Sequence, residues 1–188
     1  MTKIDHTIYT YYYYNNVLSK DSIKNLHDIF DKNSNENVDD PAKNVSKTSS
    51  LKFVDWSIMK QSMNGIEQSI LKHNKECVGY NLWPQFEGDN IILNEYDSKN
   101  QAEYGWHKDH SNNFVYDIKL TVLINVSLEK YEGGKFYLFG VGGERYIPEF
   151  DTPGSMIIFK SDQVHKVTPV TKGKRHSITM FYKGPRWQ

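Results

Sequence analysis

The second half of the chain is a series of short apolar segments separated by turn residues. From about residue 80 these segments are IILNEY, KLTVLINVSL, GGKFYLFG, SMIIF, HKVTPV and SITMFY. Gly133-Gly134, Pro153-Gly154 and Lys172-Gly173 mark the breaks between them, and such residue pairs favour turns. Strands of this length, preceded by helical segments, predict a mainly β chain with flanking α-helices, built as a jelly-roll or sandwich.

The first half has a different pattern. The stretch Tyr9–Tyr14 is typical of a strand, because Thr and Tyr suit a pleated surface. Apolar residues at helical spacing then predict two helices, the first with an N-cap at Ser19 or Asp21 and the second from about Val54 to Asn74. The residues on their apolar faces are Ile23, Leu26, Ile29 and Phe30, then Ile58, Met59, Met63, Ile66 and Ile70.

A long polar stretch, residues 31–50, separates the two predicted helices. It contains Pro41 and predicts a loop, either a lid or a solvated connection. We expect one domain over residues 1–188. In it, residues 1–79 form a helical support with an edge strand, and residues 80–188 form the jelly-roll core.

Length and charge narrow the class of protein. A chain of 188 residues can bury a hydrophobic core as one compact domain. Twenty-three basic residues balance twenty-three acidic ones, so the chain lacks the basic excess typical of proteins that bind phosphate backbones. The single cysteine, Cys77, excludes an intrachain disulfide and favours a reducing compartment. We expect its side chain to be buried or half-buried.

The sequence shows neither an apolar signal segment nor a membrane-spanning one. We therefore expect a cytoplasmic protein, or one made in the cytoplasm of an infected host if it is viral.

One set of residues in the strand-rich half has the composition of a metal site. His107 and Asp109 are two apart, so in an extended segment both side chains point to one face. This pattern alone arises often by chance, and its alternative is a satisfied His beside a solvated Asp. His165 begins a later strand. Two imidazoles and one carboxylate leave adjacent metal positions open, which suits non-haem Fe(II), whereas a structural zinc site uses four protein ligands.

Arg175 follows His165 by ten residues, beyond the turn Thr171-Lys172-Gly173. A strand that turns back after His165 brings Arg175 beside the metal, where its guanidinium can hold a carboxylate through two parallel hydrogen bonds. The side chain of Lys174 faces the other way along a strand. The pattern therefore suits a 2-oxo acid that chelates the metal and is anchored through its far carboxylate.

These motifs, in this order, resemble the prolyl-4-hydroxylase-type 2-oxoglutarate/Fe(II) oxygenases. The matching pieces are Tyr104-x-x-His107-x-Asp109, LTVLINVSL, YEGGKF from Tyr131, PGSMIIF from Pro153, and HKVTPVTKGKRHS from His165. The closing Gly184-Pro185 and the Tyr-rich opening are similar to small bacterial and phage-encoded members. The resemblance covers nearly half of the chain closely and the N-terminal half loosely.

The resemblance implies a double-stranded β-helix, a cupin-like jelly-roll with the metal in its open end. It assigns His107, Asp109 and His165 as ligands of Fe(II), and Arg175 as the anchor of the distal carboxylate of 2-oxoglutarate. O₂ is the implied co-substrate, and ascorbate is a candidate reductant.

Further residues are candidates for contact with 2-oxoglutarate. Tyr96 occupies a position where relatives place a hydrogen-bonding Tyr, with structural packing as the alternative. Ser177 shares the face of Arg175. Asn125 stands where some prolyl hydroxylases have a Tyr or Thr near the co-substrate. Tyr104 and Trp106, which flank the metal motif, either line a substrate cleft or pack against the barrel.

The remaining histidines have simpler interpretations. His110 is either next to the metal ligands or exposed, and His176 is expected to face outward because it alternates with Arg175. His6, His27 and His73 lie outside any cluster.

The implied reaction is hydroxylation of an unactivated C–H bond, coupled to decarboxylation of 2-oxoglutarate to succinate and CO₂. The favoured substrate is a peptidyl proline or another amino-acid side chain. A small metabolite, a nucleobase, a metal-dependent cupin-like reaction without 2-oxoglutarate and a vestigial binding module are the alternatives. The expected partner is a peptide, protein or small-molecule substrate, with no strong nucleic-acid binding and no membrane, and the oligomeric state stays open.

Overall fold

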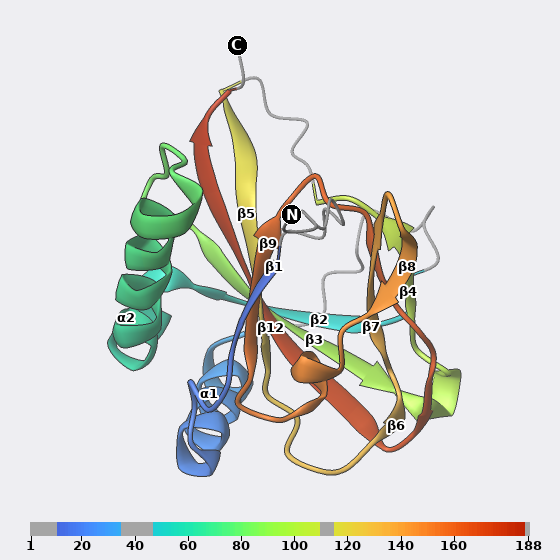
Figure 1. The fold of residues 1–188 in the computed structure, drawn as a ribbon. Coiled ribbons are helices and arrows are strands. Elements are labelled where there is room, and N and C mark those ends of the chain that lie inside the picture. The colour runs from blue at the N-terminus through green and yellow to red at the C-terminus, as the bar shows by residue number, and fades with distance from the viewer. Residues whose placement is uncertain (1–10, 35–46, 110–114, 187–188) are drawn as a thin grey trace.

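A computed structural model describes residues 11–34, 47–109 and 115–186. Two helices cover one face of a large sheet, and a smaller sheet lies on the opposite side (Figure 1). The major sheet has six strands in the order β1-β9-β5-β12-β3-β2, and the minor sheet has four in the order β4-β10-β7-β8. Neighbouring strands pair antiparallel. This arrangement confirms the predicted fold, a double-stranded β-helix with flanking helices.

The elements have the following bounds. The strands of the major sheet are β1 (Tyr11–Tyr14), β2 (Ser50–Asp55), β3 (Asn90–Asp97), β5 (Tyr116–Asn125), β9 (Met156–Lys160) and β12 (Lys174–Pro185). Those of the minor sheet are β4 (Tyr104–His107), β7 (Phe136–Gly140), β8 (Gly143–Tyr146) and β10 (His165–Val167), and a separate pair consists of β6 (Glu132–Gly133) and β11 (Val170–Lys172). The helices are α1 (Lys20–Asn33), α2 (Trp56–His73), the π-helical η1 (Asn74–Val78), and the 3-10 turns η2 (Ser98–Asn100) and η3 (Pro148–Asp151).

Helix α1 agrees with the sequence pattern. It begins after Ser19, whose hydroxyl accepts a hydrogen bond from the Ser22 amide at 3.1 Å, which satisfies one free N–H of the first turn. Ile23, Leu26 and Phe30 are buried against the major sheet. The N-cap prediction is therefore confirmed for Ser19.

Helix α2 begins two residues later than predicted, and a strand precedes it. Val54 and Asp55 end β2, which pairs with β3 along its whole length. The Asp55 carboxylate accepts a hydrogen bond from the Ser57 amide at 2.7 Å and so caps the helix. Met59 and Met63 are fully buried as expected, but Ile58 is 45% exposed, so its assignment to the apolar face was wrong.

Two apolar layers hold the sheets and helices together. The first lies between the helices and the major sheet and includes Phe30, Trp56 and Met63. The second lies between the two sheets and includes Phe136 and Phe150. Because each fully buried side chain of this size contributes about 1.5–3 kcal/mol, these layers fix the strands whose ends carry the functional residues.

The structure corrects two further expectations. The segment HKVTPV is not one strand but two, because β10 belongs to the minor sheet while β11 pairs with β6. Pro169, between them, lacks the N–H that a continuing ladder needs. Cys77 is exposed, whereas we expected at least partial burial.

The N-terminal part contributes more to the sheet than one edge strand. β1 and β2 form the two opposite edges of the major sheet, so a division at residue 79 does not separate two structural layers. Residues 9–10, most of the predicted loop at 31–50, His6 and His110 lie outside the described residues. In the ranges that the structure describes, no helix is long and apolar enough to cross a membrane.

Candidate metal centre and co-substrate pocket

Strand pairing brings the two predicted histidine ligands together. His107 ends β4 and His165 begins β10, and the two are direct partners in the antiparallel pairing of these strands. Paired residues point to the same face of a sheet, and the two imidazole centroids are 4.0 Å apart. Residues 58 positions apart in sequence thus share one site.

Asp109 completes the cluster from the segment after β4. Its amide donates a hydrogen bond to the Ser161 carbonyl at 2.9 Å. One carboxylate oxygen lies 3.6 Å from His107 Nε2 and the other lies 3.4 Å from His165 Nε2. The ligand atoms of the three residues all lie within 4.8 Å of one another, so they converge on one point as a shared metal ion requires.

Hydrogen bonds orient both imidazoles for metal binding. His107 Nδ1 is 2.8 Å from the Gly105 carbonyl, and His165 Nδ1 is 2.9 Å from the Gln163 carbonyl. A carbonyl only accepts, so each Nδ1 carries the hydrogen and each Nε2 presents its lone pair to the cluster. Burial lowers the pKa of both His107 and His165 to about 4. Both rings are therefore neutral at neutral pH and able to bind a metal.

The carboxylate is oriented in a similar way. The hydroxyl of Thr121, a fully buried residue of β5, donates to Asp109 Oδ2 at 2.7 Å. The same hydroxyl is 3.1 Å from the hydroxyl of Ser161. A donor to one oxygen limits the rotation of the carboxylate and holds it toward the histidines. The sequence analysis did not identify Thr121. Its position in LTVLINVSL, two residues before Leu123, could have indicated that its side chain lies on the same face as that of Leu123.

An aromatic ring supports His107 from the side. Tyr104 stacks on the His107 imidazole with centroids 3.4 Å apart and an angle of 15° between the rings. The ammonium of Lys47 lies 4.6 Å from the centroid of the Tyr104 ring. Lys47 and Tyr104 also form an isolated β-bridge. The residues before β2 are thereby attached to the strand that carries the metal ligand.

The donor set fits Fe(II). Two neutral imidazoles and one carboxylate form the arrangement that non-haem iron oxygenases use, with positions left for co-substrate and O₂. A structural zinc site would need a fourth protein ligand, and the cluster found in the described ranges contains only His107, Asp109 and His165.

Arg175 is a buried cation that has no carboxylate partner among the described residues. It is 1% exposed and lies on β12, between the rings of Tyr96 and Phe150, at 5.1 and 5.2 Å from their centroids. Its Nη1 donates to the Ser177 hydroxyl at 3.2 Å. In the described part of the chain, Nη2 has no hydrogen-bond partner and no acidic residue pairs with the guanidinium. Because an isolated buried charge is costly, this geometry suits an incoming anion.

One cavity of about 700 Å³ contains the predicted metal and co-substrate residues together. Its lining includes His107, Asp109, His165, Arg175, Tyr96 and Ser177. Tyr104 and Trp106 also line it, so the substrate-cleft interpretation of these aromatics agrees with the structure. Glycine is required beside the anchor, since a Cβ on Gly134 would lie 2.7 Å from Arg175 Cδ.

Asn125, unlike the other candidates for contact with 2-oxoglutarate, is not among the residues that line this cavity. Its amide donates to the Tyr131 hydroxyl at 3.1 Å and to the Phe150 carbonyl at 2.9 Å, and its oxygen accepts from the Ser127 amide. These bonds give Asn125 a structural role at the end of β5. A contact between Asn125 and 2-oxoglutarate stays a prediction, and these bonds do not support it.

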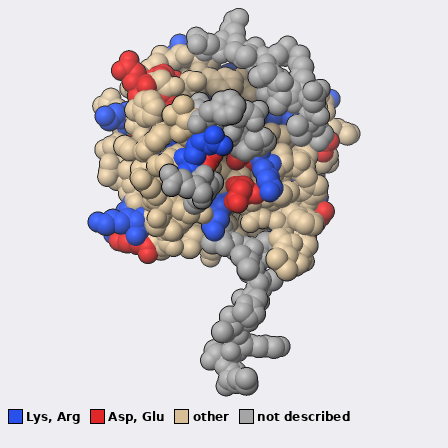
Figure 2. Space-filling model, turned by 90° about the horizontal axis from the view of Figure 1, so that it is seen from above, with Lys and Arg blue, Asp and Glu red and all other residues tan. Residues whose placement is uncertain are grey.

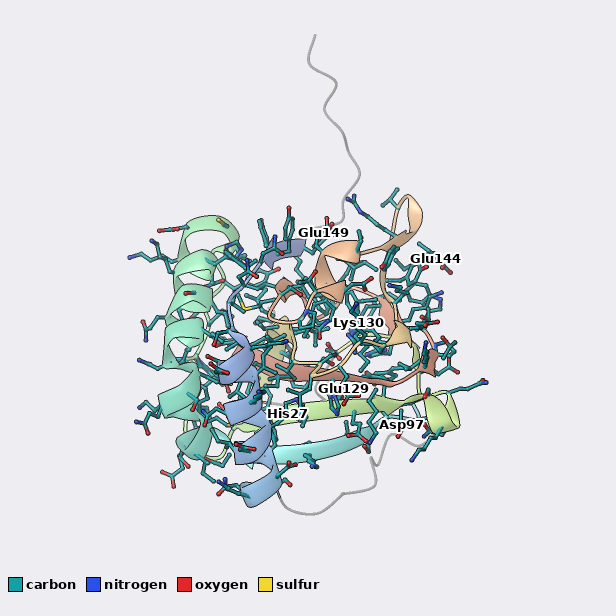
Figure 3. The ribbon with its side chains drawn as sticks, turned by 90° about the horizontal axis from the view of Figure 1, so that it is seen from below. His27, Asp97, Glu129, Lys130, Glu144 and Glu149 are labelled. Carbon is teal, nitrogen blue, oxygen red and sulfur yellow. The ribbon has the colours of Figure 1, made fainter. Side chains whose placement is uncertain are left out.

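The neighbours of Arg175 on β12 separate as strand alternation predicts. Lys174 is exposed and pairs with Glu95 at 2.8 Å and Asp97 at 3.4 Å. His176, however, does not face solvent. Its Nε2 is 2.9 Å from Glu95, and its ring packs on His27 with centroids 4.8 Å apart. Figure 3 shows His27 on α1, beside the major sheet, so this helix covers the face to which His176 points.

Comparison with known proteins agrees with this site. Residues 91–183 match the family model described as "2OG-Fe(II) oxygenase superfamily". These residues belong to the 2OG-Fe(II) oxygenase superfamily. The matched stretch contains His107, Asp109, His165 and Arg175, so the family assignment and the geometry concern the same residues.

Individual relatives give a finer comparison. A PKHD-type hydroxylase of Nitrosomonas europaea is 32% identical over 85 residues, which cover 42% of this chain and 37% of that protein. The chain therefore matches well under half the length of this relative. A Pseudomonas putida prolyl-4-hydroxylase has a TM-score of 0.72 at 17% identity, covering 94% of this chain and 93% of that one. A Trichoplax adhaerens prolyl hydroxylase, solved with a hypoxia inducible factor peptide, has a TM-score of 0.66 at 18% identity, covering 92% and 82%.

Proposed function

We propose that this chain is an Fe(II)- and 2-oxoglutarate-dependent dioxygenase. The observation that carries the proposal is the position of Arg175. A buried guanidinium, whose Nη2 has no hydrogen-bond partner among the described residues, lines the same cavity as three converging metal ligands. Those residues suit a diacid that binds the metal at one end and Arg175 at the other. Membership of the superfamily and likeness to hydroxylases support the same conclusion.

Each residue has a distinct task in the proposed reaction. His107, Asp109 and His165 would hold Fe(II), which when bound supplies the redox chemistry that activates O₂. Arg175 would anchor the distal carboxylate of 2-oxoglutarate. Ser177 would keep the guanidinium in place through its bond to Nη1.

The overall reaction consumes 2-oxoglutarate, O₂ and a substrate C–H bond. One oxygen atom enters succinate as CO₂ leaves, and the other enters the new C–OH bond. The protein contributes by orienting the reactants and excluding water from the cavity.

We infer that the hydroxylated group is a peptidyl proline or another amino-acid side chain. Relatives named as PKHD-type and prolyl hydroxylases support this, as does the peptide bound to the Trichoplax protein. The neutral net charge gives no support to a nucleobase within a nucleic acid as the substrate. We infer that the protein is cytoplasmic, because a single cysteine favours a reducing compartment.

The test is turnover of 2-oxoglutarate by the purified protein with Fe(II). Succinate is measured with and without a library of proline-containing peptides. The proposal predicts succinate formation that a substrate peptide accelerates and that Asp109→Ala abolishes. Lys172→Ala, an exposed change on β11, is the matched control and should behave like the parent. Absence of succinate under all of these conditions would refute the proposed reaction.

A further inference from the structure

The minor sheet has an aromatic outer face. Phe136, Leu138 and Val167 turn their side chains into the core between the two sheets, so the residues that alternate with them point away from that core. Among the outward rings, Phe139 is 47% exposed and the others are half-buried. We call four of these rings the aromatic surface: Trp106 of β4, Tyr137 and Phe139 of β7, and Tyr146 of β8.

Strand pairing sets these rings in a row across the sheet. Tyr137 is the partner of Tyr146 on one side and of Lys166 on the other, and paired residues point to the same face. The ammonium of Lys166 lies 4.2 Å from the centroid of the Trp106 ring and 5.0 Å from that of Tyr137. Phe139 meets Trp106 edge-on, with centroids 5.6 Å apart. The row therefore runs Trp106, Lys166, Tyr137, Tyr146, with one residue from each strand.

Two lysines that touch the aromatic surface are paired with carboxylates. Lys166 pairs with Glu144 at 2.9 Å, and Lys135, beside the Tyr146 ring, pairs with Asp151. Because these charges are balanced, neither lysine favours an anionic ligand. In the view from above, acidic and basic side chains likewise stand side by side near the centre of the face (Figure 2). We therefore expect the ligand of the aromatic surface to be neutral.

The aromatic surface adjoins the cavity that contains the metal ligands. Trp106 belongs to both, because it packs against Phe139 and also lines the cavity. Trp106 directly precedes the ligand His107 in the chain, so their Cα atoms are about 3.8 Å apart. Its strand β4 is an edge of the minor sheet, on the side of the molecule away from the helices (Figure 1). A peptide with one residue at the metal can therefore cross β4 and continue over the aromatic surface.

The spacing of the rings fits a polyproline II helix. Adjacent strands are about 4.8 Å apart, so Trp106 and Tyr137, two strands apart, are separated by about 9.6 Å across the sheet. A polyproline II helix repeats every three residues, or about 9.3 Å. Residues i and i+3 of such a helix therefore meet the two rings in turn. A β-strand would bind instead through free backbone groups at a sheet edge, whereas a polyproline II helix binds aromatic surfaces through its side chains.

We propose that the aromatic surface binds a proline-rich segment of a peptide substrate in the polyproline II conformation. One proline contacts Trp106, the residue three positions along contacts Tyr137, and the segment continues toward Tyr146. The residue to be hydroxylated lies at the Trp106 end, in the cavity. The inference rests on the proposed function for the peptide nature of the substrate, and it names the sequence feature beside the target residue by which that substrate is recognised.

Peptide binding tests this without any turnover. The protein is loaded with Zn(II), which has no redox chemistry, and with 2-oxoglutarate, and two neutral peptides are titrated by calorimetry. The first is an oligoproline of about nine residues, which spans roughly 28 Å as a polyproline II helix. The second is a flexible Gly-Ser peptide of the same length. Both peptides are acetylated and amidated, so they differ in conformation and side chains but not in charge.

We expect the oligoproline to bind about tenfold or more tightly than the Gly-Ser peptide. Tyr137→Thr removes the ring and keeps a residue suited to a strand, and it should weaken oligoproline binding about tenfold or more. Tyr137→Phe should bind like the parent, because the ring and not the hydroxyl makes the contact. Tyr13→Thr is the matched control, the same change at a tyrosine of the major sheet that is 48% exposed. Thermal unfolding confirms that each variant is folded, and Phe139→Thr replaces Tyr137→Thr if that variant is not.

The outcomes separate this inference from the proposed function. Equal binding of the two peptides, or no binding of either, overturns it, as does oligoproline binding that is unchanged in Tyr137→Thr. Sedimentation tests a second copy of the chain as the occupant, and a dimer that Tyr137→Thr abolishes also overturns the inference. If the oligoproline binds as expected but no 2-oxoglutarate is consumed with Fe(II), the aromatic surface stands and the proposed reaction is wrong. If peptides are hydroxylated and Tyr137→Thr changes neither their Michaelis constant nor oligoproline binding, the reaction stands and this inference is wrong.

Discussion

Arg175→Met removes the guanidinium and keeps a long side chain of similar volume. In the protein without co-substrate, Arg175 is 1% exposed, and Nη2 has no partner in the described part of the chain. Replacing a buried charge with an apolar side chain is often neutral or stabilising by about 1–4 kcal/mol. A methionine here would pack between the rings of Tyr96 and Phe150. We therefore expect the thermal midpoint without 2-oxoglutarate to stay constant or rise, by about 2–4 °C per kcal/mol.

The same change should have the opposite effect once 2-oxoglutarate is present. Loss of a buried charge pair costs about 2–5 kcal/mol of binding free energy, which corresponds to a loss of affinity of at least roughly 30-fold. Saturating 2-oxoglutarate stabilises a protein that binds it in the folded state. Addition of 2-oxoglutarate should therefore raise the midpoint of the parent and leave that of Arg175→Met almost unchanged.

Calorimetric titration of 2-oxoglutarate into the Zn(II)-loaded proteins measures the affinity directly. Lys174→Met is the matched control, because Lys174 is the exposed neighbour and pairs with Glu95 and Asp97 instead. Pyruvate, which lacks the distal carboxylate, should bind the parent more weakly than 2-oxoglutarate does. This difference in affinity should be smaller in Arg175→Met. A variant that binds 2-oxoglutarate as tightly as the parent would remove the anchor assignment, and with it the main structural reason to name this co-substrate.

Three further changes test the metal site and the opposite face of the sheet. Asp109→Ala should retain Zn(II) weakly and form no succinate with Fe(II), because it removes the one carboxylate of the cluster; turnover at the parental rate would contradict the ligand assignment. Thr121→Val should weaken binding of Zn(II) or Co(II) about 10- to 100-fold, since it removes the donor to Asp109 Oδ2, and an unchanged metal titration would rule out this role. The hydrogen bond from His176 holds the pKa of Glu95 at about 2, below its ordinary 4.5. A lowered carboxyl pKa stabilises the fold above pH 4.5, and the contribution is lost as pH falls toward 2. Unfolding midpoints of the parent should therefore fall more steeply over this interval than those of Glu95→Gln, and equal slopes would show that the bond contributes nothing.

The parts of the site that follow local rules could be predicted from the sequence. Strand alternation places Arg175 and Ser177 on one face and Lys174 on the other, and the structure agrees because β12 is regular over this stretch. The N-cap at Ser19 is a local signal of the same kind. In each case the geometry depends on neighbours within a few residues, so it can be recognised without knowing the rest of the fold.

Features set by pairing between distant strands could not be predicted in this way. The segment from Leu51 to Met59 carries apolar residues in a pattern compatible with either a strand or a helix. Its first part forms a strand because β2 pairs with β3, and the helix begins where Asp55 caps it. Asn125 is similar, since its partners Tyr131 and Phe150 come from later segments. Strand alternation correctly predicts that the side chain of His176 points away from that of Arg175. It does not reveal that α1 covers the face of the sheet to which His176 points.

The break between β10 and β11 shows why the metal ligand and the anchor are separated by ten residues. A continuous strand would carry Arg175 about 33 Å from His165, too far for one small diacid to contact both the metal and the guanidinium. The chain instead leaves the minor sheet at Val167, pairs briefly with β6, and reverses direction into β12. Gly173 makes this reversal in the left-handed region, with φ of 70°, where a Cβ would lie 2.8 Å from the Lys130 carbonyl oxygen. The ten residues from His165 to Arg175 are thus the length of chain that this turn needs. The turn returns Arg175 to the cavity that His165 also lines.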